Sequence, residues 1–270
     1  MMKLAISWLF CLMLSGAALA APDTILFAVN EGTSSSTDAL FRTDKYDDLA
    51  KHLSAVVGKN VKMETSNILS VAIRNLERQR YDVLLIRPSH ISAQAMRDHG
   101  YRLLVAAKGE SKVHFLVKKD SPLKSLKDVE GRFVVMPDKS AYPTNLALAI
   151  LRDEKLKPGR LQFMDRQEAV GYAVRVGLAD VGVVISYSKV AKEWEKEGGR
   201  FLHTRDKLPF WSVIVSPKVT EATAGKLKQA LLDLDKTPAG QEMLKKIGVP
   251  GFVEGNQQAY LDMLKWVEGK

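Results

Sequence analysis

The chain has a single cysteine among its 270 residues, and this residue, Cys11, lies near the start of the sequence. The residues around it have the features of a secretory signal peptide: a basic start at Lys3, an almost unbroken apolar run over residues 4–17, and small residues at Ala18 and Ala20. We predict cleavage after Ala20, which removes the cysteine. Disulfides and thiolate chemistry are then excluded, and burial of a core must hold the fold together.

Long hydrophobic runs are also missing beyond that point, because no later stretch approaches the roughly 20 apolar residues of a membrane-spanning helix. We therefore expect no stable membrane insertion. The chain has 40 Lys and Arg against 31 Asp and Glu, and loss of Lys3 lowers the formal net charge from +9 to +8. A basic excess can indicate nucleic acid, a membrane surface or an anionic ligand. Export disfavours nucleic acid, and the alternating charges of residues 189–197 are typical of a solvated helix face.

Motifs of catalytic and metal sites are absent as well. The sequence has no Gly-x-Ser-x-Gly, no His-Glu-x-x-His and no glycine-rich phosphate loop, and none of its five histidines has metal-ligand spacing to another. Without a local motif, a nucleophile and its base would have to come from distant parts of the chain, and the lack of cysteine and the small number of histidines disfavour this. We therefore predict a binding protein with no catalytic residues, no metal and no cofactor.

Apolar strands alternate with amphipathic helices in two stretches, residues 24–86 and 132–197. This alternation predicts an α/β fold with mostly parallel sheets, whose ligand crevices open at the carboxyl ends of the strands. Between the two stretches, residues 101–107 and 113–118 flank a polar turn and predict an antiparallel pair. A returning strand is expected at residues 209–216, followed by terminal helices.

Residues 132–151 combine a short apolar strand, a polar turn and a helix. Pro143 has its φ preset for a first helical turn, so we expect the helix to begin there, with Tyr142 or Ala141 as its cap. The free N–H groups of Thr144 and Asn145 would then point outward. Together with nearby hydroxyls they could hold phosphate, sulfate or carboxylate. An ordinary strand-to-helix connection is the alternative.

Three segments resemble one known family. Residues 81–90 match its strand followed by Gly-Pro, residues 118–132 are similar to its Lys-Asp-Ser … Leu-x-Asp-Leu-x-Gly start of the second lobe, and residues 177–184 resemble its Gly-x-Val-Asp-Ala strand. The family is that of the periplasmic solute-binding proteins of the phosphate, phosphite and phosphonate type, which serve ATP-driven importers. The resemblance covers nearly all of the mature chain, and residues 118–132 are its most specific part.

The resemblance implies the α/β type II periplasmic-binding fold, in which two lobes with mostly parallel sheets are joined by two crossing hinge segments and close over a ligand. After a signal peptide at residues 1–20, the first lobe is expected at residues 21–118 and 205–270 and the second at 119–204. The implied protein is a periplasmic monomer that delivers a small anion to the permease of an ABC importer. Presentation of the ligand to a membrane histidine kinase is the alternative.

The family holds the anionic head with a Ser/Thr-rich turn at a helix start in the second lobe, and residues 137–144 match this turn. Tyr142 and Pro143 stand where small residues are usual, so fewer hydroxyls surround the anion. The ligand-binding residues expected from this turn are Ser140, Ala141, Tyr142, Thr144 and Asn145.

In the first lobe Arg87 replaces the family's glycine, and Ser89 and His90 follow it. Arg87 could make a bidentate contact to carboxylate or phosphate, whereas a surface arginine at a strand end is the alternative. For His90 the alternative is a helix-capping or partly buried histidine. Ile185 stands where amine-recognising members have an acid, which removes the partner of an aminoalkyl group.

Three aromatic side chains are expected to line the mouth of the cleft: Tyr187, Phe210 and Trp211. With such walls, an anion that has an apolar or aromatic body is as compatible with the site as bare phosphate. Packing of these rings within a lobe is the alternative.

Overall fold

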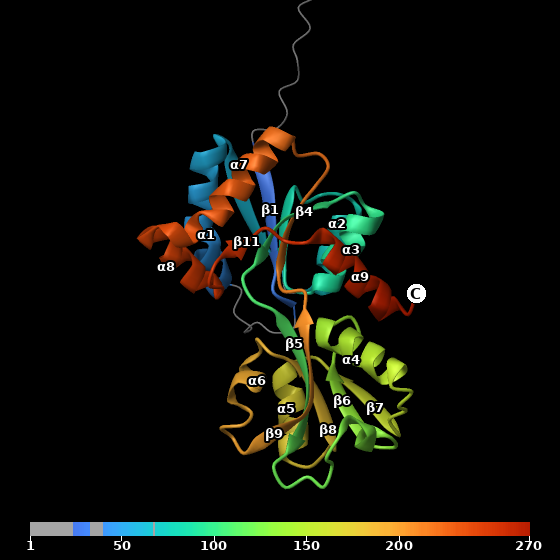
Figure 1. Cartoon of the computed structure of the whole chain (residues 1–270). Helices are drawn as coiled ribbons and strands as arrows, with labels where there is room; N and C mark the ends of the chain where they lie inside the picture. Colours follow the sequence, from blue (N-terminus) through green and yellow to red (C-terminus); the bar gives the residue numbers. More distant parts are fainter. Residues whose placement is uncertain (1–23, 33–39, 67) are drawn as a thin grey trace, which may run out of the picture.

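The computed structural model describes residues 24–32, 40–66 and 68–270 (Figure 1). The predicted signal peptide, its cleavage site and most of the polar loop at residues 31–37 lie outside this part of the chain. The described residues form two sheets with helices on both faces, one above the other in Figure 1.

The first sheet has the strand order β11-β4-β10-β3-β1-β2. Its strands are β1 (Thr24–Asn30), β2 (Asn60–Thr65), β3 (Val83–Ile86), β4 (Arg102–Ala107), β10 (Ser212–Val215) and β11 (Phe252–Val253). Its helices are α1 (Leu40–Val57), α2 (Leu69–Glu77), α3 (Ser89–Asp98), α7 (Glu221–Leu232), α8 (Pro238–Ile247) and α9 (Gln257–Glu268), with a 3₁₀ turn, η3 (Leu234–Lys236), before α8.

Neighbouring side chains along each strand point to opposite faces of the sheet and divide the core of this lobe into two parts. Phe27 and Leu85 face α1, α7 and α8, whereas Ala28 and Leu84 face α2, α3 and α9. Side chains of a strand point to opposite faces in turn, so a fully apolar run such as β3, Val83–Ile86, requires cover on both sides.

The second sheet has the strand order β7-β6-β8-β5-β9. Its strands are β5 (Ser111–Lys118), β6 (Phe133–Pro137), β7 (Arg160–Met164), β8 (Val181–Ile185) and β9 (Gly199–Leu208). Its helices are α4 (Tyr142–Asp153), α5 (Gln167–Arg175) and α6 (Lys189–Glu193), with a 3₁₀ turn, η2 (Leu126–Val129). One face packs against α4 and the other against α5 and α6.

Both sheets are mixed. The strands that alternate with helices are parallel, as the alternation in the sequence predicted. Strand β1 is parallel to β2 and β3, and strand β6 is parallel to β7 and β8. All pairs that involve β5 or β10 are antiparallel.

The prediction that residues 101–107 and 113–118 pair with each other was wrong. Strand β4 pairs with β10 and β11 in the first sheet, whereas β5 pairs with β8 and β9 in the second. The sequence indicates two strands and a short connection, but that pattern is the same for a hairpin and for a passage between two sheets. The partners that bury each strand decide the outcome.

Residues 108–110 and 209–211 are therefore the two connections between the sheets (Figure 1). Because β5 and β9 belong to the second sheet, we propose that the second lobe comprises residues 111–208, a wider range than the expected 119–204.

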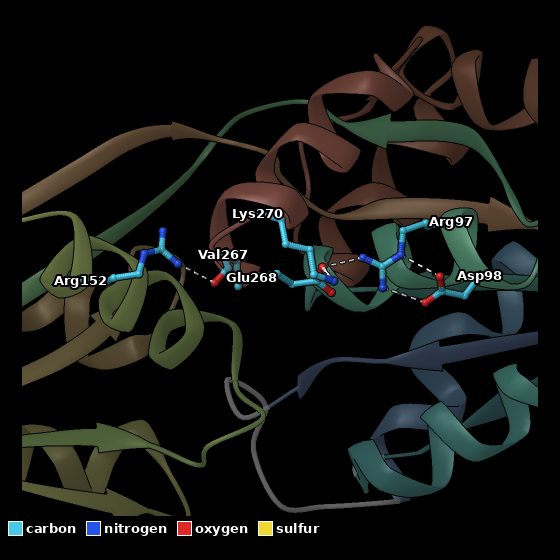
Figure 2. Close-up of polar contacts among 6 residues, drawn as sticks. All are labelled: Arg97, Asp98, Arg152, Val267, Glu268 and Lys270. Carbon is cyan, nitrogen blue, oxygen red and sulfur yellow. Dashed lines mark hydrogen bonds and ion pairs between the residues drawn. The ribbon is translucent and has the colours of Figure 1, made fainter.

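The C-terminal helix α9 contacts both lobes. Figure 2 shows Arg97 of α3 paired with Glu268, and Arg152 at the end of α4 donating to the carbonyl of Val267 at 3.2 Å. Arg152 also donates to the carbonyl of Trp266. The indole N–H of Trp266 in turn donates to the carboxylate of Asp153, the residue that follows Arg152. One cluster of buried side chains runs through α3, α9 and α4, so the two lobes share a continuous core.

Candidate functional site

The first turn of α4 lies between the lobes. The ring of Tyr142 stacks on His90 of α3 with a centroid distance of 5.6 Å and an interplanar angle of 13°. Its hydroxyl donates to the carbonyl of Pro209, in one of the two connecting segments, at 3.2 Å. Both rings are buried, so Tyr142 packs the start of α4 against the first lobe.

The helix begins one residue earlier than predicted, at Tyr142, with Ala141 as its cap. For this reason the expectation of a free amide at Asn145 was wrong, since its N–H already donates to the carbonyl of Ala141 at 3.1 Å. The Asn145 side chain donates to the carbonyls of Ala141 and Lys139. Asn145 thus stabilises the turn itself.

The two hydroxyls expected to bind the anion have partners within the turn. Thr144 is fully buried and donates to the carbonyl of Pro137, the last residue of β6, at 2.9 Å. Ser140 is exposed and donates to the carboxylate of Asp138 at 2.5 Å. A contact of either hydroxyl with a ligand stays a prediction, and it requires these bonds to be shared or exchanged.

Ser89 and His90 begin α3 and face the connecting segment. The Ser89 hydroxyl lies 3.1 Å from the carbonyl of Pro209 and 2.9 Å from that of Phe210. His90 is 4 % exposed, and its Nδ1 has no hydrogen-bond partner in the described part of the chain. These contacts place both residues at the junction of α3, α4 and the segment 209–211.

Burial lowers the pKa of His90 to about 4 from an ordinary value of 6.5. The neutral ring therefore contributes stability that is fully present above pH 6.5 and is lost as the pH falls toward about 4. The change His90→Phe keeps a ring against Tyr142 and removes this titration. We expect the melting temperature of the variant to fall less on acidification than that of the wild type, as measured by calorimetry. His114, whose pKa is lowered in the same way, is present in both proteins, and equal falls would contradict a buried neutral His90.

Arg87 is buried, which excludes the alternative of a surface arginine. Its guanidinium lies 4.0 Å from the ring centroid of Trp211 and 6.0 Å from that of Tyr187, and it is paired with Glu31 at 3.3 Å. The rings of Tyr187 and Trp211 meet edge to face at 5.4 Å. A planar cation over the face of an indole is a favourable contact that also fixes the orientation of the guanidinium.

Glu31 is the centre of this cluster, and the sequence reasoning did not select it. Lys45 and the Tyr46 hydroxyl both lie 2.5 Å from one carboxylate oxygen, and Arg87 pairs with the other. Burial alone would raise the pKa of Glu31, but the charges of Arg87 and Lys45 outweigh it and hold this pKa below its usual value. The available signal was its position directly after β1, where a strand of a parallel sheet ends at a crevice.

Gln167 is a second residue that the sequence reasoning missed. It opens α5, is 1 % exposed, and accepts the N–H of Ile185 at 2.8 Å through Oε1. Because a backbone N–H can only donate, this bond fixes which end of the amide is the oxygen. The Nε2 group is left as a buried donor without a partner among the described residues. Such a donor costs about 1–3 kcal/mol unless a ligand or water accepts from it.

A small cavity joins these groups across the interface. Its walls come from the first lobe (Glu31, Gly32, Leu69 and Pro88) and from the second (Ala141, Tyr142, Pro143, Gln167 and Tyr187). Its volume is about 10 Å³, which is room for about one water molecule. An oxyanion can therefore enter only when the lobes move apart.

Comparison with protein families shows which family the chain belongs to. Residues 35–260 match the family of the ABC transporter phosphonate periplasmic substrate-binding proteins. The chain belongs to this family. The family consists of periplasmic solute-binding components of importers, as the resemblance in the sequence implied. A search of curated proteins finds no match.

Solved structures confirm the two-lobed type II fold of this phosphonate-family protein. XAC2383 from Xanthomonas citri bound to ATP has a TM-score of 0.75 at 15% identity, covering 90% of this chain and 97% of that chain. PhnD1 from Prochlorococcus marinus in complex with methylphosphonate has a TM-score of 0.73 at 14% identity, covering 92% and 98%. The aliphatic sulphonate binding protein SsuA from Escherichia coli has a TM-score of 0.61 at 15% identity, covering 92% and 80%.

Two further observations concern the described residues of this family member. No helix in the ranges 24–32, 40–66 and 68–270 combines the length and apolarity needed to cross a membrane. The same residues contain no group of three or more His, Cys, Asp or Glu side chains that could hold a metal ion.

Proposed function

We propose that this protein captures a small oxyanion between its lobes and delivers it to the membrane subunits of an ABC importer. The observation that carries the proposal is the unpartnered Nε2 of Gln167, which lines the interlobe cavity beside the first turn of α4. A buried amide donor and the positive end of a 12-residue helix both favour an anion at this point.

The relatives favour a tetrahedral oxyanion as the ligand class. Methylphosphonate and ATP are bound in the structures of PhnD1 and XAC2383, and SsuA is a sulphonate-binding protein. All three ligands present phosphorus or sulfur oxygens. Amine-recognising members of the family have an acid at the position of Ile185. In this chain the Ile185 side chain is apolar and buried, so an aminoalkyl group has no partner there.

Capture requires a change in the lobe arrangement. The cavity of about 10 Å³ corresponds to closed lobes, and the segments 108–110 and 209–211 are the places where hinge rotation would occur. The contacts of Tyr142 with His90 and Pro209 must break on opening. They stabilise closure even before a ligand binds, which lowers the fraction of protein competent to accept it.

A thermal-shift screen tests the ligand class. The panel consists of phosphate, phosphite, methylphosphonate, methanesulfonate and acetate, each added to the purified mature chain. We expect at least one phosphorus or sulfur oxyanion to raise the melting temperature in a concentration-dependent manner, because a ligand of the native state stabilises it by mass action. Acetate serves as the planar control. A rise with acetate alone would favour the carboxylate alternative over our proposal.

We further propose that the protein acts by binding alone, as a periplasmic monomer released by cleavage after Ala20. The mass of the mature protein checks the cleavage site. Turnover assays with phosphate esters and phosphonates check the absence of catalysis, and steady release of product would contradict it.

A further inference from the structure

A groove of about 640 Å³ lies outside the interlobe cavity, between α9 and the end of β9. This volume falls in the range of about 300–1,000 Å³ that is usual for small-molecule sites. Its walls come from both lobes: Ala106 and Val253 belong to the first sheet, and Arg205, Lys207 and Leu208 belong to β9 of the second. The groove shares no lining residue with the interlobe cavity.

Three aromatic side chains are among the residues that line the groove. Phe210, Tyr260 and Trp266 line it together with Met263. The Tyr260 hydroxyl donates to the carbonyl of Phe210 at 2.8 Å, which ties α9 to the connecting segment. The indole N–H of Trp266 donates a hydrogen bond to the carboxylate of Asp153. These bonds hold two of the rings in place, so the wall is formed before any ligand arrives.

The charged groups of the groove leave its cations available. Glu110 and Glu254 are paired with Lys112 and Lys228, at 3.1 and 2.7 Å, and Asp262 accepts from Gln258 at 2.8 Å. By contrast, neither Arg205 nor Lys207 has a salt bridge with an acid in the described part of the chain. The pKa of Asp153 is lowered by hydrogen bonds from Trp266 and Arg152 and, to a smaller extent, by the charge of Arg205. Arg205 instead lies over the Trp266 ring at 5.4 Å.

A β-bulge in β9 lies at the two cations of the groove. In β9, Arg205 lies opposite Val113 and Leu208 opposite Ser111, so Asp206 and Lys207 together face the single residue between them on β5. Lys207 has a φ of 56°, a left-handed conformation that costs roughly 1–2 kcal/mol for a residue other than glycine. Bulges of this kind redirect side chains and occur next to binding sites.

We infer that this groove is a second ligand site, which binds a small planar anion with an aromatic body. The rings supply a stacking surface, and Arg205 and Lys207 supply two charge-assisted donors for a sulfonate, phosphate or carboxylate group. Because both lobes form the walls, an occupied groove stabilises the lobe arrangement of this structure.

Calorimetric titration with 2-naphthalenesulfonate tests the inference on the mature chain. We expect saturable binding at one site, and an association constant that falls by at least about tenfold in the double variant Arg205→Gln, Lys207→Gln, which loses both charged donors. The neutral analogue 2-naphthalenemethanol should bind the wild type more weakly by a similar factor. Melting temperatures of all variants establish that they are folded.

Arg175→Gln is the matched control, because Arg175 also lies over a tryptophan, Trp194, at 5.6 Å but lines a different cavity. It should leave the binding of the sulfonate unchanged. Absence of saturable binding to the wild type, or equal binding by the double variant, would overturn the inference. So would a loss in Gln167→Glu as large as in the double variant, since the probe would then occupy the interlobe cavity. Capture of oxyanions between the lobes is measured with other ligands, so failure of this test would leave the proposed function unaffected.

Discussion

Replacement of Gln167 by glutamate is expected to weaken binding of the captured oxyanion by about 100-fold, because it removes a donor to a charged acceptor and adds a like charge. The change is nearly isosteric. It keeps the oxygen that accepts the N–H of Ile185, so the start of α5 remains held. Calorimetric titration with the oxyanion found in the thermal-shift screen measures the effect.

Gln162→Glu is the control for the added charge. Gln162 lies on β7 in the same lobe, accepts a hydrogen bond from Arg160 at 3.1 Å through its own Oε1, and does not line the interlobe cavity. We expect the Gln162→Glu variant to bind the oxyanion with the affinity of the wild type. Equal losses in both variants would indicate a general effect of charge on the lobe and would remove Gln167 from the site.

Replacement of Arg87 by methionine is expected to lower the free energy of unfolding by about 3 kcal/mol, because it leaves the buried carboxylate of Glu31 with fewer compensating charges. Both side chains are largely buried, at 9% and 6% exposure, and the guanidinium also packs over Trp211. Urea unfolding of the two proteins at neutral pH measures the loss.

Arg80→Met provides the comparison at the surface. Arg80 pairs with Glu64 at 2.8 Å, with side chains 51% and 30% exposed, and such a pair contributes less than about 1 kcal/mol. A similar loss in the two variants would show that the Arg87 pair is no stronger than a surface pair.

The Arg87 variant should also change the response to acid. The charges of Arg87 and Lys45 lower the pKa of Glu31 below its ordinary 4.5, so its ion pairs contribute stability that is present above pH 4.5 and is lost as the pH falls. Without Arg87 the pKa of Glu31 rises toward or above its ordinary value, so the loss of stability below pH 4.5 should be smaller than in the wild type. An unchanged acid limb in the urea midpoints would contradict this coupling.

The sequence contained enough local information for most of the elements. Pro143 placed the start of α4 to within one residue, because its ring presets φ for the first turn. The alternation of strands and helices indicated the parallel pairs of both sheets. It could not indicate that β4 and β5 belong to different sheets, because partner choice depends on residues more than 60 positions away, such as Val183 and Ile214.

The candidate site was harder to predict than the fold. Arg87 was found because it departs from a family pattern, whereas its cluster depends on Glu31, Lys45 and Tyr46, which carry no motif. Gln167 becomes a candidate only when the bond to Ile185 N–H and the burial of Nε2 are known. Both facts are tertiary, and no spacing in the sequence encodes them.

A crystal structure of the mature chain with the tightest-binding oxyanion of the panel tests the central claim most directly. Our account predicts the anion between the lobes, with one oxygen about 2.7–3.2 Å from Nε2 of Gln167 and the others near the first turn of α4. An anion bound at any other place, or no binding by any member of the panel, would contradict it.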